Sequence, residues 1–375
     1  MMNRELAEAF AFSIPVLGAL GCMIMLLLDA CAINRNKQEK RLRLFLALTY
    51  GVTSLGWFGL VLYIVSPGGF IYYHTVFLMA LMFDQVMFYR FVAVITGTGR
   101  PRKFSRLHIL IPLFLTGISA VSDLLVTGEK QMGVVYGEAE QMSDGWFHVV
   151  FMLTTVIFVV YNTVYPLLSL RNIYRYRRFV VDYSSDVQHT SLDWLFVMQV
   201  LILICVPVPL AGLLLNIEII ASSWFVWLGA LPYFAYYMIL CYNMLDENYL
   251  IVQSHAEEDT ESFSRHVPFD RKYFERYVRE KKPYLNPKLR ITDLATELKT
   301  NRSYLSTFIN CEYGMNFSRF VNRCRLNALD RLRVAPENAD KCNMELVLMA
   351  GFNGYRNYLR VKNEEDGRNL LREFE

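Results

Sequence analysis

Long apolar stretches alternate with short polar segments over the first two thirds of the chain. A helix needs about 20 apolar residues to cross a hydrocarbon core roughly 30 Å thick, and seven stretches reach that length. They cover residues 10–30, 43–65, 71–95, 107–126, 147–170, 194–216 and 223–245. Prolines inside several of them kink a membrane helix without excluding it. The pattern therefore predicts a bundle of seven transmembrane helices.

The last third has the shorter periodicity of amphipathic helices. "DRKYFERYVREKKPYL" predicts a first helix that ends before two prolines. Apolar residues then recur at i, i+3, i+4 and i+7 from Ile291 to Leu298, which predicts a short helix with Thr292 as a capping candidate. "KTN" is expected to form a turn, and Asn301 is expected to cap the helix that follows.

This second helix has two distinct faces when its residues are placed 100° apart. The apolar face, expected to lie in the core, holds Tyr304, Leu305, Phe308 and Ile309. The polar face holds Arg302, Ser303, Ser306, Thr307 and Asn310. Arginine can pair with guanine, asparagine with adenine, and hydroxyl groups with bases or phosphates, so the polar face suits the major groove of DNA. A solvated surface helix would show the same split.

Composition supports a membrane part and a soluble part. The chain has 375 residues, of which 54% are hydrophobic, and a formal net charge of +3. Residues 268–375 carry 21 lysines and arginines against 15 aspartates and glutamates. An excess of positive charge is typical of a surface that contacts phosphates. We therefore divide the chain into a transmembrane domain at 1–246, an acidic linker at 247–267 and a soluble domain at 268–375.

Lysine and arginine in the short connections predict the orientation. They follow the first, third and fifth apolar stretches, and the alternate connections are nearly free of them. The residues are Arg35, Lys37, Lys40, Arg41, Arg43, Arg100, Arg102, Lys103, Arg106, Arg171, Arg175, Arg177 and Arg178. The N-terminus is therefore expected outside, and the soluble domain is expected in the cytoplasm, where DNA lies.

The soluble domain resembles a known family. "LRITDLATELKTNRSYLSTFINCEYGMNFSRFVNRCRL" (289–326) is similar to the first helix-turn-helix of the AraC/XylS transcription regulators of bacteria, and "MELVLMAGFNGYRNYLRV" (344–361) to the second. The resemblance implies two such units, joined by a linker helix at about 316–333, that dock into successive major grooves of double-stranded promoter DNA. It implies that the polar face from Arg302 to Asn310 contacts bases or backbone. It also implies that Tyr355, Arg356 and Asn357 begin the second recognition helix.

The chain departs from the family pattern in three places. Lys299 stands where a turn glycine is usual, so a left-handed backbone is expected at a residue with a side chain. Lys362 occupies a position where the family buries a phenylalanine, and "EEDGRNLLREFE" (364–375) lacks the proline that normally follows its glycine. The last two departures predict a weaker second unit, which steadies the first rather than reads bases.

The membrane stretches offer one polar site, centred on Asp84. An ionisable residue near the middle of a span costs at least about 2.5 kcal/mol unless it is paired or solvated. Arg90 follows six residues later, about 240° around the helix, so we name both residues but expect Asn162 or Gln199 as the closer partner. Asp84 is either a structural clamp or a ligand or proton site. His74, His108 and His148 lack ligand spacing, and no metal site is expected.

No catalytic motif is present in the sequence, and we expect neither enzymatic activity nor a cofactor. The leading hypothesis is an all-α regulator of the bacterial inner membrane, which couples an unknown ligand or membrane partner to promoter binding; a homodimer is one state open to it. The alternative is a membrane receptor or transporter-like protein whose cytoplasmic tail is an interaction module without DNA binding.

Overall fold

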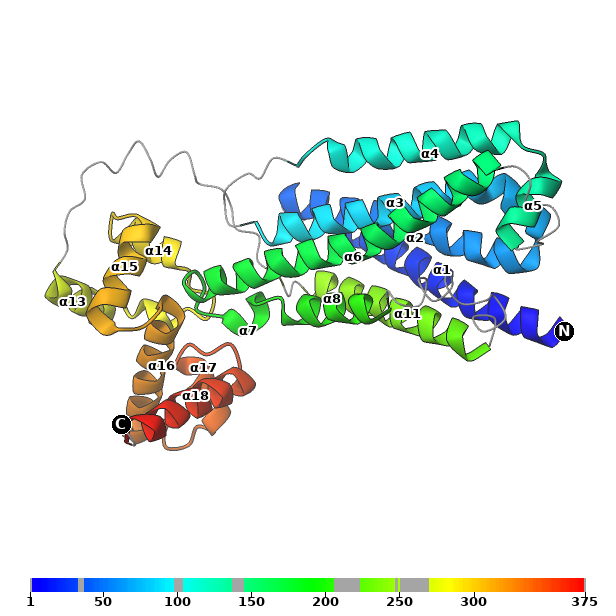
Figure 1. Cartoon of the computed structure of the whole chain (residues 1–375). Helices are drawn as coiled ribbons and strands as arrows, with labels where there is room; N and C mark the ends of the chain where they lie inside the picture. The colour runs from blue at the N-terminus through cyan, green and yellow to red at the C-terminus, as the bar shows by residue number, and fades with distance from the viewer. Residues whose placement is uncertain are drawn as a thin grey trace. The chain divides into compact units, whose positions relative to one another are not determined.

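The computed structural model describes residues 2–32, 37–97, 104–136, 145–205, 223–246, 249 and 270–373. Within these residues the chain folds into helices, as predicted, with one isolated antiparallel bridge between Ser184 and Arg290. The described residues form two compact units (Figure 1). The first unit comprises residues up to 97, then 104–173 and 192–249; the second comprises 174–191 and 270–373.

The first unit holds the long apolar helices. They are α1 (Met2–Ala30), α2 (Lys37–Val65), α3 (Pro67–Ile95), α4 (Leu107–Leu125), α5 (Gly128–Tyr136), the first part of α6 (Gly145–Val181), α8 (Asp193–Cys205) and α11 (Ser223–Leu245). Among the described residues, α1, α2, α3, α4 and α6 are long and apolar enough to cross a membrane. These five helices coincide with the first five predicted stretches. The seventh stretch coincides with α11, and the sixth begins as α8 and continues outside the described residues.

Helices α1, α2 and α11 pack together around a buried arginine. α2 packs along both α1 and α3, and α1 also packs along α11. Arg43 is fully buried on α2, forms a salt bridge with Asp29 of α1 and donates to the Met244 carbonyl oxygen of α11 at 3.2 Å. The sequence analysis counted Arg43 as a loop charge. It lies instead inside the bundle, because α2 begins six residues before the apolar stretch does.

Helix α6 also continues beyond its apolar stretch. The basic segment after residue 170 was expected to be a connection, but it stays helical as far as Val181. Arginine and tyrosine do not oppose a helix strongly, and no glycine or proline interrupts this segment. As a consequence, α6 begins in the first unit and ends in the second.

The second unit contains two pairs of helices with one further helix between them. Its elements are the end of α6, α7 (Val187–Thr190), α13 (Arg271–Lys281), η2 (Pro283–Leu285), α14 (Ile291–Glu297), α15 (Arg302–Tyr313), α16 (Phe317–Val334), η3 (Pro336–Asn338), α17 (Asn343–Met349) and α18 (Tyr355–Glu373). We call α14 and α15 the first helix pair, and α17 and α18 the second helix pair. α16 lies at the expected position of the linker helix.

The turn in the first helix pair has the expected conformation. Lys299 is left-handed with φ 52°, and the Asn301 side chain accepts a hydrogen bond from the Tyr304 N–H at 2.8 Å. Asn301 is therefore confirmed as the cap of α15. Thr292 does not cap α14, because that helix already begins at Ile291. The N–H of the preceding residue, Arg290, donates to the Asp293 carboxylate instead.

The second helix pair has its own core, which corrects the expectation for Lys362. Lys362 is exposed, and Val361 fills the buried position instead. Gly351 in the turn has φ 92°, and a side chain there would meet the Tyr284 carbonyl oxygen at 2.4 Å. The core of the second helix pair consists of Leu329, Leu346, Val347, Ala350, Phe352, Tyr358 and Val361. The second pair is therefore a packed unit, although it lacks the family's phenylalanine.

Residues 174–191 belong to the second unit through backbone pairing. The Ser185 N–H donates to the Leu289 carbonyl oxygen at 3.0 Å, and the Ile291 N–H donates to the Tyr183 carbonyl oxygen at 2.9 Å. Near the second pair, the Asn353 amide donates to the Asp186 carboxylate at 2.9 Å. This segment, which the sequence analysis placed within the transmembrane domain, is thus an integral part of the second unit.

Candidate functional site

Helix α15 presents the predicted polar face. Ser303, Thr307 and Asn310 are exposed, whereas Leu305 and Ile309 on the opposite side are completely buried. Arg302 and Ser306 are half-buried. Tyr304 and Phe308, which were expected in the core, are also only half-buried, and Phe308 packs edge-to-face on the buried Phe274 of α13. The core under this helix therefore rests on its two aliphatic side chains more than on Phe308.

The end of α6 contacts the first residue of α15. The Arg302 guanidinium carbon lies 4.0 Å from the ring centroid of Phe179 and 5.5 Å from that of Tyr183. The two rings are themselves stacked, with centroids 5.2 Å apart. Arginine is attracted to aromatic faces by the ring quadrupole, so this contact holds Arg302 against α6.

A carboxylate adds to this contact. Burial raises the pKa of the Asp182 carboxyl, and the nearby positive charge of Arg302 opposes part of that rise. Asp182 follows α6 directly, between the two aromatic residues that hold Arg302. Arg302 therefore has both an aromatic and an acidic neighbour on the same short segment.

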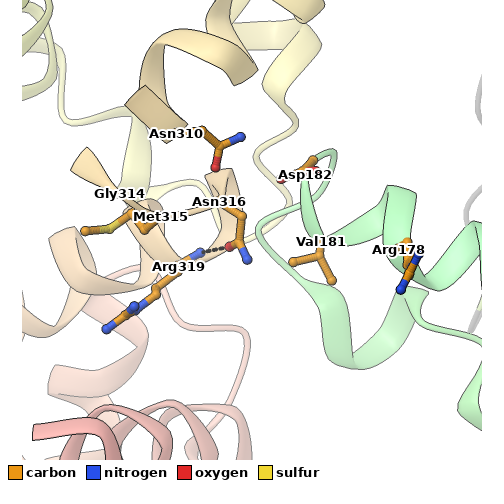
Figure 2. Close-up of a pocket in the computed structure, with 8 residues that line it drawn as sticks. All are labelled: Arg178, Val181, Asp182, Asn310, Gly314, Met315, Asn316 and Arg319. Atoms are coloured by element: carbon orange, nitrogen blue, oxygen red, sulfur yellow. Dashed lines mark hydrogen bonds between the residues drawn. The ribbon is translucent and has the colours of Figure 1, made fainter. Parts of the chain in front are cut away.

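The other end of α15 faces a hollow of about 580 Å³ (Figure 2). Arg178, Val181 and Asp182 line it from the end of α6, and five residues line it from the side of α15 and α16, namely Asn310, Gly314, Met315, Asn316 and Arg319. The Asn316 side chain caps α16 by accepting from the Arg319 N–H at 2.9 Å. The α6 end thus contacts the start of the polar face, while a gap separates it from Asn310.

This arrangement limits what α15 can contact. A helix with its side chains is about 10–12 Å wide, and the major groove of B-DNA is about 12 Å wide. A groove that admits α15 has no room for the α6 residues stacked on Arg302. In the arrangement described, the Arg302 end of the polar face is covered and the Asn310 end is open.

The predicted residues of the second helix pair are only partly exposed. Arg356 is exposed and Tyr355 is 37% exposed. Asn357, by contrast, is 3% exposed, beside the core residue Tyr358 and one turn before Val361. We therefore correct the expectation that Asn357 faces DNA. Neither atom of its amide has a hydrogen-bond partner among the described residues.

Arg325 of α16 is a central residue that the sequence analysis missed. It is completely buried, and it donates to the Tyr284 and Asn286 carbonyl oxygens at 2.9 and 2.8 Å and to the Ser185 hydroxyl at 3.0 Å. Its guanidinium also lies over the Phe352 ring at 5.9 Å. Burial lowers its pKa to about 10, so it remains charged at neutral pH.

The sequence did contain a signal for Arg325. It falls four residues after Val321 and four before Leu329, on the apolar face of α16. An arginine on a buried helix face is stable only if its guanidinium is hydrogen-bonded, and the Arg325 guanidinium is. It joins the segment before α14, the 174–191 segment and the second helix pair.

A second arginine of α16 fixes the second helix pair. Arg319 forms a two-pronged salt bridge with Glu365 of α18, with nitrogen–oxygen distances of 2.5 and 3.0 Å. Both side chains are less than one fifth exposed. Such two-pronged pairs restrict orientation as well as distance, so α18 is held in a defined orientation on α16.

In the first unit, Asp84 of α3 accepts a hydrogen bond from the Thr53 hydroxyl of α2, a partner that we did not predict. Both line a cavity of about 120 Å³ with Asn162 of α6. The Asn162 amide, however, donates to the Phe158 carbonyl oxygen of its own helix. Asp84 is thus held by an uncharged partner beside a small cavity.

Arg90 does not belong to this site. It is exposed, and its guanidinium lies over the rings of Phe104 at 5.1 Å and Phe45 at 5.8 Å. The 240° separation from Asp84 along α3 places it on another side of the helix. The predicted intramembrane site is therefore corrected to Asp84 with Thr53.

Comparisons with known proteins assign neither a family nor a function to this chain. No family model, no curated protein and no solved structure matches this chain. Among the described residues, no group of histidine, cysteine, aspartate and glutamate side chains could hold a metal ion. The functional argument therefore rests on the geometry of the two units.

Proposed function

We propose that this protein is a membrane-embedded one-component transcriptional regulator. In this proposal the first unit spans the bacterial inner membrane and receives a ligand or partner, and the second unit binds promoter DNA in the cytoplasm. The observation that carries the proposal is α15, whose exposed face offers hydroxyl and amide groups while its opposite face is buried. These exposed groups are of the kind that reads base edges.

The scaffold behind α15 supports the proposal. The first and second helix pairs, each with a turn that contains a left-handed residue, fit the double helix-turn-helix that the sequence resembles. Arg325 holds the segment before α14 and the turn of the second helix pair to α16, and the salt bridge between Arg319 and Glu365 holds α18 to the same helix. Arg356, which is exposed at the start of α18, provides a positive charge for a second contact.

The contact between α6 and Arg302 suggests how binding is controlled. Since α15 cannot enter a groove while Phe179 and Tyr183 cover Arg302, DNA binding requires this contact to open. α6 contributes residues to both units, so a change of its position or rotation in the first unit would reach Arg302 through one continuous helix. The described arrangement is then the closed state of the regulator.

The test is a selection of random double-stranded DNA with the full-length protein in lipid nanodiscs. A regulator should enrich a defined sequence, and its affinity should fall steeply with salt, because phosphate contacts release counterions. The full chain is needed because residues 174–191 are part of the second unit. If no sequence is enriched and binding is absent at low salt, the alternative of a tail that serves as an interaction module is favoured.

A further inference from the structure

A second cavity lies in the first unit, and it is larger than the one beside Asp84. Its volume is about 240 Å³. One face of α3 lines it with His74, Phe77, Leu78 and Leu81, which follow the i, i+3, i+4, i+7 spacing of a single helical stripe. Side chains of α2, α5 and α6 complete the lining, mostly with phenylalanine, tyrosine and aliphatic groups. The cavity is therefore apolar and strongly aromatic.

The short helix α5 closes one end of this cavity. Its Val135 belongs to the lining, and its Tyr136 ring is stacked on Tyr63 of α2 with centroids 4.6 Å apart. The Tyr136 hydroxyl also donates to the Tyr63 carbonyl oxygen at 2.8 Å. At the other end of α5, the Gln131 amide donates to the carbonyl oxygens of Asp123 and Val126. These bonds hold α5 in place over the cavity.

His74 supplies a polar atom without a partner. Its side chain is almost completely buried, and its Nδ1 lies 3.4 Å from the Asp123 carboxylate of α4. The same carboxylate accepts from the Thr75 hydroxyl at 2.5 Å. A carboxylate beside Nδ1 favours the tautomer with the proton on that nitrogen, which leaves Nε2 as an acceptor. Within the described residues, Nε2 is buried and has no hydrogen-bond partner.

We infer that this cavity is a binding site for a small, flat aromatic molecule that carries one hydrogen-bond donor, such as a phenol, a naphthol or an indole. The ring would pack among the phenylalanine and tyrosine side chains, and the donor would bind His74 Nε2. Buried polar atoms are nearly always hydrogen-bonded, so a donor on the ligand would supply the hydrogen bond that His74 Nε2 lacks.

The size of the cavity sets the size of the ligand. An apolar protein cavity of about 150 Å³ binds benzene, which has six carbon atoms. In proportion, a cavity of about 240 Å³ holds about ten non-hydrogen atoms, which corresponds to two fused rings. The site is independent of DNA binding, and its test involves no DNA.

The experiment compares two probes on the full-length protein in nanodiscs, with empty nanodiscs as the reference for partition into lipid. 2-Naphthol has the donor, and 2-methoxynaphthalene has the same rings without it. Saturable binding of 2-naphthol is expected, about fivefold to tenfold tighter than that of the methyl ether, which is the usual effect of one buried hydrogen bond. In His74→Phe the two probes should bind alike.

A pair of variants locates the site. Thr155→Phe places a ring in the cavity and should abolish binding, because Thr155 is part of the lining. Val156→Phe, at the adjacent position, is the control, because Val156 is 52% exposed on the outer side of α6. Equal affinity for both probes on the unmodified protein, or binding no greater than to empty nanodiscs, would overturn the inference. So would equal binding by the two α6 variants.

Discussion

At the scale of single residues, Arg325 has the clearest structural role. Its guanidinium donates to two carbonyl oxygens of the segment before α14, those of Tyr284 and Asn286, and the Asn286 oxygen also accepts from the Leu289 N–H. Truncating it to methionine keeps much of the volume but removes the charged donor from both oxygens and leaves the Tyr284 oxygen without this partner. We expect Arg325→Met to lower the local unfolding free energy of residues 283–291 by about 3 kcal/mol. Amide hydrogen exchange of these residues measures the change.

Arg331 provides a matched control for Arg325. It lies on the same helix and is exposed, with one hydrogen bond to the Asn327 carbonyl oxygen. Arg331→Met should change the free energy by less than about 0.5 kcal/mol, as exposed substitutions usually do. Equal exchange rates in both variants would mean that Arg325 does not hold the segment before α14.

A second prediction at the residue scale concerns Asp84. Asp84→Asn keeps the shape of the side chain and its contact with Thr53 but removes the charge. If the carboxylate receives a proton or a ligand, the amount of protein in the membrane should stay nearly constant while reporter transcription becomes fixed on or off. Arg90→Gln is the control, since Arg90 lies away from this cavity. A normal reporter response in Asp84→Asn would reduce Asp84 to a structural clamp.

At the scale of elements, the covering of α15 by the end of α6 can be tested directly. Phe179→Ala removes the nearer ring from Arg302. Since a cation–π contact contributes about 0.5–2 kcal/mol, DNA affinity should rise by that amount when the closed state is weakened. Fluorescence anisotropy with a labelled duplex from the selection measures the affinity.

Tyr174→Ala is the control for this change. Tyr174 is also an aromatic residue of α6, but its ring is paired with Arg178 at 4.9 Å rather than with Arg302. This variant should leave DNA affinity unchanged. An unchanged or lower affinity in Phe179→Ala would contradict the covering role of α6.

The sequence predicted those elements that are determined by neighbouring residues along the chain. The capping of α15 by Asn301 and the end of α13 before Pro283 depend on residues next to one another, and both were predicted. The bond between Ser185 and Leu289 joins backbone groups more than 100 residues apart, and no side-chain pattern encodes it.

The candidate site was predictable to a similar extent. The two faces of α15 follow from helical periodicity, and they are present in the structure. The burial of Asn357 depends on which face of α18 meets α16 and α17, and the resemblance alone placed it wrongly. The hydrogen bond from Thr53 to Asp84 requires the packing of two long helices, whose relative rotation the sequence does not specify.

At the scale of the whole molecule, the orientation in the membrane decides whether the second unit can reach DNA. The positive charges of the connections predict that a reporter fused after Leu250 is active only in the cytoplasm, and one inserted near Gly137 only outside. Paired enzyme reporters that work on opposite sides of the membrane measure both positions in one strain. The reverse pattern would remove the second unit from DNA and with it the proposed function.

The central claim is that α15 reads DNA, and its most direct test is the affinity of variants for the enriched duplex in nanodiscs. Asn310→Ala should weaken binding by about 1–3 kcal/mol. Arg302→Ala should do the same, and it is made in the Phe179→Ala protein so that the lost DNA contact is measured apart from the opening of the contact between α6 and Arg302. Arg279→Ala removes an equal charge from exposed α13 and should have a smaller effect, as should Arg356→Ala. Binding that persists without Arg302 and Asn310 but disappears without Arg356 would contradict the account and assign base reading to the second helix pair.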